Sequence, residues 1–202
     1  MKSAIASVLA RGDYLSGVLP NHTLPRRHSI PITSEDARDS KFSSFAIQTE
    51  NMYEILLRSH SGLRWVVFAL VLGAIFRAFT NMSSGKFTPL DDKLSLFSLI
   101  SVHIQLLLGF GLYFISPVVK GAMEAGMGAA MKDSVMRFWL AEHMTGMIIG
   151  IALITVGRIA AKKAATDQAK FKKIAVYFTI GLIIILATIP WPFREALGRG
   201  WF

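Results

Sequence analysis

Four apolar segments, each close to the length that a helix needs to cross a lipid bilayer, constrain this chain more than any other feature. A membrane-spanning helix needs about 20 predominantly apolar residues. Since these segments fill most of the chain after residue 60, the sequence predicts an all-α, integral-membrane four-helix bundle. The predicted helices cover about residues 62–80, 94–118, 136–159 and 171–190.

Residues 1–51 differ in composition from the rest of the chain, because they are rich in Ser, Thr, Pro and charged side chains. Such a segment cannot bury enough apolar surface to fold, so we predict a mostly disordered tail. Its apolar stretch AIASVLA is too short for a secretory signal and is followed at once by Arg11 and Asp13. Met52 directly precedes the first regular segment. The alternative hypothesis is therefore that residues 1–51 are an upstream extension of a 52–202 membrane domain.

The chain contains no cysteine. Disulfides, thiolate metal sites, iron–sulfur clusters, covalently attached c-type haem and cysteine nucleophiles are therefore excluded. The remaining metal ligands are His, Met and carboxylate side chains. The formal charge of +9 does not indicate a nucleic-acid partner, because many basic residues are concentrated between two membrane segments.

The basic residues indicate how the bundle is oriented in the membrane. Cytoplasmic loops of membrane proteins carry an excess of Lys and Arg. The side with the first and third connections has nine such residues and the other side, without the tail, has seven. The nine are Arg77, Lys86, Lys93, Arg158, Lys162, Lys163, Lys170, Lys172 and Lys173. The pattern predicts that both termini lie outside the cytoplasm.

Two histidines are placed inside predicted helices. With a rise of about 1.5 Å per residue, His103 lies roughly 12 Å from the cytoplasmic face and His143 roughly 9 Å from the external face. Their depths then differ by only about 9 Å in a core of about 30 Å. An ionisable side chain at such depth should point into the bundle towards a partner. His103 and His143 are therefore candidate axial ligands of one haem iron. The alternative is that each hydrogen-bonds a hydroxyl or a backbone carbonyl on a neighbouring helix.

A row of glycines follows His143 on the same helical face. Gly146, Gly150 and Gly157 lie three, seven and fourteen residues after it. Such a row provides room for a flat macrocycle beside the histidine. Close helix–helix packing through small residues explains the same spacing without a cofactor. Both interpretations remain open at this point.

A second polar group lies at the external end of the first helix. His60 and Arg64 are four residues apart and share one face. Arg64 is a candidate partner for a haem propionate, and His60 for a second cofactor or a quinone headgroup. The alternatives are an interfacial role for His60 and an Arg64 that extends to lipid phosphate. Gln105 is predicted to hydrogen-bond between helices, and Glu142 to reach water or to pair with Arg137 or Arg64.

Methionines recur every four residues at Met123, Met127 and Met131 in the external link. Thioether clusters suit Cu(I), which gives a copper-handling hypothesis. The alternative is an amphipathic interfacial segment whose methionines rest on the bundle.

Several segments carry a resemblance to a known family. These are RSHSGLRWVV, KLSLFSLISVHIQLLLGFGLYFIS, MKDSVMRFWLAEH, AKFKKI and IPWPFRE. They resemble small bacterial four-helix membrane proteins labelled cytochrome b or cytochrome b-like, over about residues 52–202. The resemblance implies haem b and electron transfer in the bacterial cytoplasmic membrane, with His60, His103 and His143 as the matching histidines. Since b-type cytochromes with two haems normally supply four histidines, one haem ligated by His103 and His143 is expected.

The first hypothesis for function is therefore a membrane protein that binds one haem b and transfers electrons, with quinone or the subunits of a respiratory complex as partners. The second hypothesis is a copper-binding or copper-transport protein that uses His60, His143 and the external methionines. The third is a cofactor-free structural subunit. The sequence has no phosphate-binding glycine loop, no HExxH motif and no pair of carboxylates at a useful spacing. Hydrolase and transferase chemistry is therefore not indicated.

Overall fold

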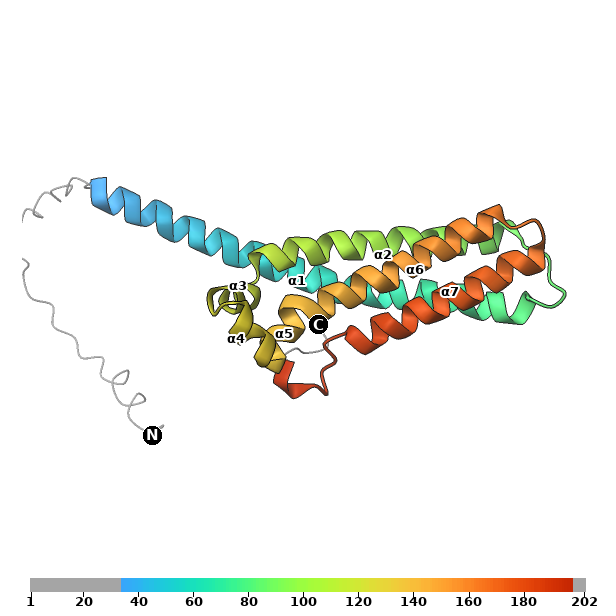
Figure 1. Ribbon diagram of the computed structural model, residues 1–202. Helices are drawn as coiled ribbons and strands as arrows, with labels where there is room; N and C mark the ends of the chain where they lie inside the picture. The colour runs from blue at the N-terminus through green and yellow to red at the C-terminus, as the bar shows by residue number, and fades with distance from the viewer. Residues whose placement is uncertain (1–33, 198–202) are drawn as a thin grey trace, which may run out of the picture. The chain divides into compact units, whose positions relative to one another are not determined.

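A computed structural model describes residues 34–197, and every regular element in this range is a helix. The four long helices are α1 (Ser34–Asn81), α2 (Pro89–Ile115), α6 (His143–Lys163) and α7 (Asp167–Thr188) (Figure 1). The shorter ones are α3 (Pro117–Glu124), α4 (Met127–Lys132), α5 (Ser134–Arg137), the π-helix η1 (Phe138–Glu142) and the 3-10 helix η2 (Glu195–Leu197). The all-α prediction is confirmed for the described residues.

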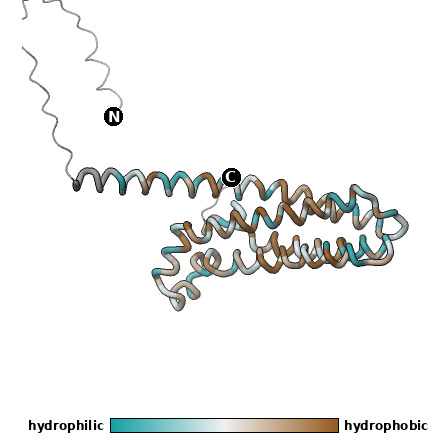
Figure 2. The backbone as a smooth tube through the Cα atoms, turned by 90° about the horizontal axis from the view of Figure 1, so that it is seen from above, coloured by the Kyte–Doolittle hydropathy of each residue, from teal (hydrophilic) through white to brown (hydrophobic). Residues whose placement is uncertain are grey.

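Four helical spans are long and apolar enough to cross a membrane, as the sequence predicts. They are Lys41–Asn81, Pro89–Ile115, Ser134–Lys163 and Asp167–Thr188. Figure 2 shows hydrophobic residues along these helices and hydrophilic ones near the end where α1 joins α2 and α6 joins α7. Many large apolar side chains point outward, such as Phe76 and Leu107, each 70% exposed. An outward apolar surface of this kind suits lipid and indicates a multi-pass membrane protein.

The first helix begins much earlier than predicted. α1 starts at Ser34 instead of about residue 62, and residues 34–51 continue it. The prediction of a disordered segment is thus corrected for residues 41–51, while residues 1–33 lie outside the described residues. Hydropathy detects only the apolar part of a helix, so a polar helical extension gives no such signal.

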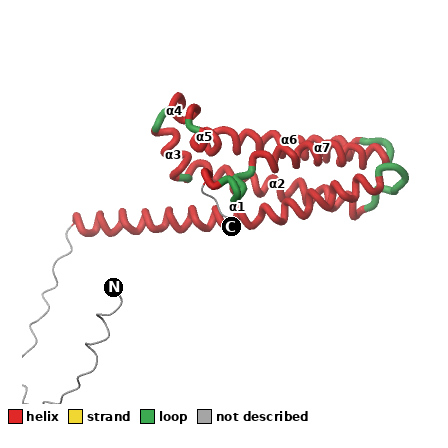
Figure 3. Tube along the Cα trace, turned by 90° about the horizontal axis from the view of Figure 1, so that it is seen from below, coloured by secondary structure: helices red, strands yellow, loops and turns green. Residues whose placement is uncertain are grey.

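The bundle lies within Phe42–Phe202, a compact unit distinct from the residues up to Lys41. Its main core is formed by apolar side chains from all four long helices. Val71 of α1, Val102 of α2, Ile154 of α6 and Phe178 of α7 are each at most 1% exposed in this cluster. Short loops connect α1 to α2 and α6 to α7 at the same end of the bundle (Figure 3).

Small residues bring α6 and α7 into close contact. A Cβ atom added at Gly150 would lie 2.9 Å from the backbone oxygen of Gly181 and 2.6 Å from Ile185 Cγ1. One added at Gly146 would overlap Thr188, and one at Gly157 would lie 2.5 Å from Tyr177 Cβ. The glycine row therefore packs against a neighbouring helix. The interpretation that Gly146 and Gly150 provide room for a macrocycle is corrected accordingly.

Ion pairs fix the start of α2 at the loop end of the bundle. Thr88 and Asp91 form a capping box, in which the Asp91 carboxylate accepts from the Thr88 backbone N–H at 2.9 Å. Asp91 also accepts from the Arg77 guanidinium of α1, and Asp92 accepts from Arg158 Nη1 of α6 at 2.6 Å. The two adjacent carboxylates therefore connect α2 to both neighbouring helices.

Candidate cofactor site

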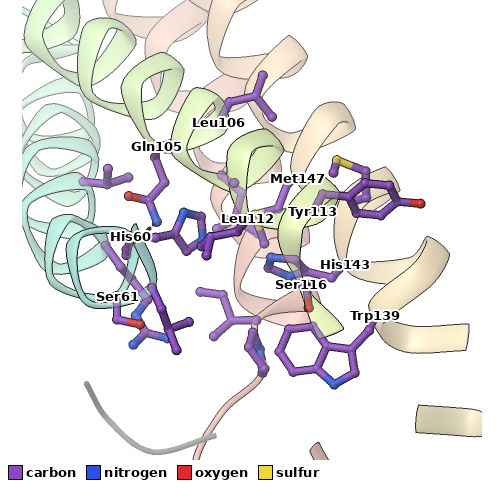
Figure 4. A pocket seen from close by; sticks show the side chains of 18 of the residues that line it. His60, Ser61, Gln105, Leu106, Leu112, Tyr113, Ser116, Trp139, His143 and Met147 are labelled. Carbon is purple, nitrogen blue, oxygen red and sulfur yellow. Dashed lines mark hydrogen bonds between the residues drawn. The ribbon is translucent and has the colours of Figure 1, made fainter. Parts of the chain in front are cut away.

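A cavity of about 340 Å³ lies between the long helices, near the end of the bundle that holds α3, α4 and α5. Its lining is mostly apolar, with side chains such as Phe68, Val102 and Ile185. A few polar groups interrupt this lining, and Figure 4 shows several of them directed towards the middle of the cavity. They are His60, Ser61, Arg64, Gln105, Tyr113, Ser116 and His143. A concave apolar site with a small number of polar groups is the usual form of a cofactor or ligand site.

Two imidazoles lie close together, edge to face, in the lining of this cavity. The ring centroids of His60 and His143 are 6.5 Å apart, and the ring planes are inclined by 75°. His60 comes from α1 and His143 is the first residue of α6, so the pair joins helices that are distant in the sequence. A metal–imidazole bond is about 2 Å, and roughly 1 Å more separates the nitrogen from the ring centre. Two imidazoles that share one metal ion therefore place their centroids about 6 Å apart.

His143 is held by a backbone acceptor. Its Nδ1 lies 2.7 Å from the carbonyl oxygen of Thr188, at the end of α7. This geometry places the proton on Nδ1, because a carbonyl can only accept, and leaves Nε2 as the basic nitrogen. A histidine that ligates a metal is commonly oriented in this way. The aromatic rings of Phe138 and Trp139 pack against it, with centroids 5.9 and 6.0 Å from that of His143.

His60 has a different environment. Its Nδ1 is buried and has no hydrogen-bond partner among the described residues. The ring rests against α2 at Gly109, where an added Cβ would lie 3.1 Å from His60 Cε1. One helical turn from Gly109, Gln105 donates from Nε2 to the His60 backbone oxygen at 2.8 Å. The predicted role of Gln105 between helices is thus confirmed, and α2 fixes both the backbone and the ring of His60.

Arg64 lines the same cavity one turn after His60, as their spacing predicts. Its guanidinium carbon lies 5.7 Å from the ring centroid of Trp65, a cation–π contact. Arg64 therefore brings a positive charge to an otherwise apolar site. A carboxylate on a ligand in this cavity is the natural partner for that charge.

His103 does not reach the cavity. Its side chain is exposed on the outward face of α2, and Nδ1 lies 2.8 Å from the Leu99 oxygen of its own helix. The adjacent Val102 lines the cavity instead, because one residue corresponds to about 100° around a helix. The expectation that His103 and His143 face each other is therefore wrong. His60 lies close to His143 instead.

The backbone before His143 is a π-helix, η1, over Phe138–Glu142. Three contacts hold it in place. Tyr113 donates its hydroxyl to the Leu140 oxygen at 3.0 Å, Arg137 pairs with Glu142 at 2.6 Å, and the Arg194 guanidinium lies 4.7 Å from the Phe138 ring centroid. The predicted pairing of Glu142 with Arg137 is confirmed. π-Helical turns occur frequently at functional sites, where they direct a side chain.

The external methionines do not form one cluster. Met123 belongs to α3, whereas Met127 and Met131 belong to α4, and the chain turns between them at Gly126 with a φ of 84°. Met123 and Met127 are 50% and 63% exposed, and Met131 packs against a small second core. Among the described residues, no group of three or more His, Asp or Glu side chains is arranged to hold a metal ion.

Sequence reasoning missed several residues of this site. Tyr53 and Leu57 line the cavity from the part of α1 that precedes the predicted helix. Gly109 gave no signal, because the need for a glycine appears only once His60 is placed against it. No protein-family model, curated protein or solved structure matches this chain.

Proposed function

We propose that this chain is a b-type cytochrome-like membrane protein that binds one haem b between His60 and His143 and transfers electrons within the membrane. The observation that supports this proposal is the pair of imidazoles 6.5 Å apart in the lining of an apolar cavity. Haem iron takes four ligands from its porphyrin, so two histidines complete its coordination. Since the chain has no cysteine, the protein would hold the haem without a covalent thioether bond.

In this proposal the residues of the chain have separate tasks. His143, oriented by the Thr188 carbonyl, and His60, supported by Gln105 and Gly109, would hold the haem iron through their ring nitrogens. Arg64 supplies a cation for a propionate. The apolar walls exclude water and thereby influence the reduction potential. Bound haem would supply one-electron redox chemistry. Quinone or a redox subunit of a respiratory complex remains the proposed electron partner.

A visible spectrum tests this function directly. The full chain, purified in detergent from haem-replete cells, is expected to show a Soret band that shifts on reduction with dithionite. The pyridine haemochrome is expected to give about one haem per chain. A colourless protein that is fully folded by circular dichroism would overturn the proposal and favour a cofactor-free subunit. Stoichiometric copper without haem would favour the copper hypothesis.

Orientation in the bacterial cytoplasmic membrane is proposed from charge. The loop end of the bundle carries the dense basic cluster around Lys162 and Lys163, so this end is proposed to face the cytoplasm. The chain has no native cysteine, so a single introduced thiol reports its own location.

Ser84→Cys in the α1–α2 loop and Gly128→Cys in α4 form a matched pair at opposite ends of the bundle. With a membrane-impermeant maleimide and the cytoplasmic membrane sealed, we expect labelling of Gly128→Cys alone. Ser84→Cys should react only after the membrane is permeabilised. The reverse pattern would place the termini in the cytoplasm.

A further inference from the structure

A second cavity, of about 310 Å³, lies at the loop end of the bundle, where α2 and α7 begin and α6 ends. Its charged lining residues are Asp92, Arg158, Lys162 and Lys170, so positive charges outnumber negative ones by two. His143 and Arg158 are fifteen positions apart on α6, which corresponds to about 22 Å. The second cavity is therefore separate from the histidine site, and the inference drawn from it does not rest on haem binding.

Arg158 is the central group of this cavity. It is only 3% exposed, which is unusual for a charged residue. Nη1 donates to Asp92 Oδ1 at 2.6 Å, but Nε is buried and has no hydrogen-bond partner among the described residues. A buried donor without an acceptor destabilises the folded protein. The guanidinium therefore retains capacity for a further anionic acceptor.

Two lysines also line this cavity. Lys162 is one turn after Arg158 on α6 and is exposed. Lys170 comes from the first turn of α7, where Nζ lies 2.9 Å from Asp167 Oδ1 and 5.3 Å from the Phe87 ring centroid. These contacts hold the Lys170 ammonium at the cavity. A buried guanidinium with two ammonium groups in front of it suits a phosphate, which has several acceptor oxygens.

We propose that the cavity lined by Arg158, Lys162 and Lys170 binds a phosphate group. Two sources share this chemistry: the headgroup of an anionic phospholipid and a soluble phosphate. The cavity lies within about two turns of the ends of membrane-spanning helices, and basic pockets at that depth bind anionic lipid headgroups. Bound phosphate would connect the cationic side chains of α6 and α7 and would stabilise the folded bundle.

The test measures the thermal midpoint and the apparent Kd of the full chain in neutral detergent. Phosphatidylglycerol, diacylglycerol without a phosphate, and inorganic phosphate at constant ionic strength are titrated separately. Phosphatidylglycerol is expected to raise the midpoint, whereas diacylglycerol is not. If inorganic phosphate produces the same rise and competes with the lipid, the source is soluble phosphate. A rise with the lipid alone assigns the site to the headgroup.

Variants matched in charge test whether the phosphate group binds in this cavity. Arg158 itself is left intact, because removal of its charge would leave Asp92 without its partner. The double variant Lys162→Gln/Lys170→Gln is expected to raise the apparent Kd at least about tenfold. The control Lys172→Gln/Lys173→Gln removes the same charge from exposed positions outside the cavity and should change the Kd less than about twofold. Equal losses in the two variants, or equal binding of diacylglycerol, would overturn the proposal.

Discussion

Replacement of either His60 or His143 by alanine is expected to lower the haem content of the purified protein at least about tenfold, because loss of even a supporting group at a metal site commonly costs 10–100-fold in affinity. Both imidazoles border the central cavity, and each would supply one axial bond. The measurement is the pyridine haemochrome per chain, together with the dithionite-reduced spectrum.

His103→Ala is the matched control for these variants. It removes the same side chain from the same bundle, but at an exposed position where the ring bonds only to its own helix. Haem content should stay within about twofold of the wild type in this control. Loss of haem in His103→Ala, or retention in either His60→Ala or His143→Ala, would refute the ligand assignment. Far-UV circular dichroism of each variant distinguishes loss of ligand from loss of fold.

The membrane-spanning segments were predictable because the bilayer imposes one length on every apolar helix. The predicted ends at residues 80 and 190 lie within two residues of the observed ends of α1 and α7. The start of α1 was not predictable from hydropathy, because the longest apolar run in residues 34–51 is the three residues FAI. Helix propensity and packing, to which hydropathy is insensitive, decide such a boundary.

The same boundary explains the error in the candidate site. A helix start near residue 62 places His60 just outside the predicted helix, at the membrane interface. Since α1 continues through it, His60 lies inside a helix and lines the central cavity. The prediction for His103 rests on its depth in the membrane, but depth fixes only the position along a helix axis. The direction around the axis depends on how the helices pack, and it turns Val102 inward and His103 outward.

The second large effect is expected from a substitution in the row of glycines on α6. Gly150→Ala is expected to lower the free energy of unfolding by about 1–3 kcal/mol, the usual cost of overpacking a close contact. The added methyl group would lie 2.9 Å from the Gly181 backbone oxygen, so a rotamer change cannot remove the overlap and α6 must move away from α7. Thermal or SDS-induced unfolding, followed by circular dichroism in detergent, measures the change.

Gly62→Ala provides a control in which the free energy of unfolding is expected to rise. Gly62 lies in α1 with nothing within 4 Å of an added Cβ, so the variant should gain about 0.5–1 kcal/mol from the lower backbone entropy of its unfolded state. The loss in Gly150→Ala should be equally large in protein that lacks haem, because the row contacts α7 and not the cavity. If Gly150→Ala were harmless without haem and destabilising only with it, the glycines would belong to the cofactor site after all. Equal destabilisation in both forms would instead assign them to helix packing, and would leave His60, Arg64 and His143 as the groups that determine what the cavity binds.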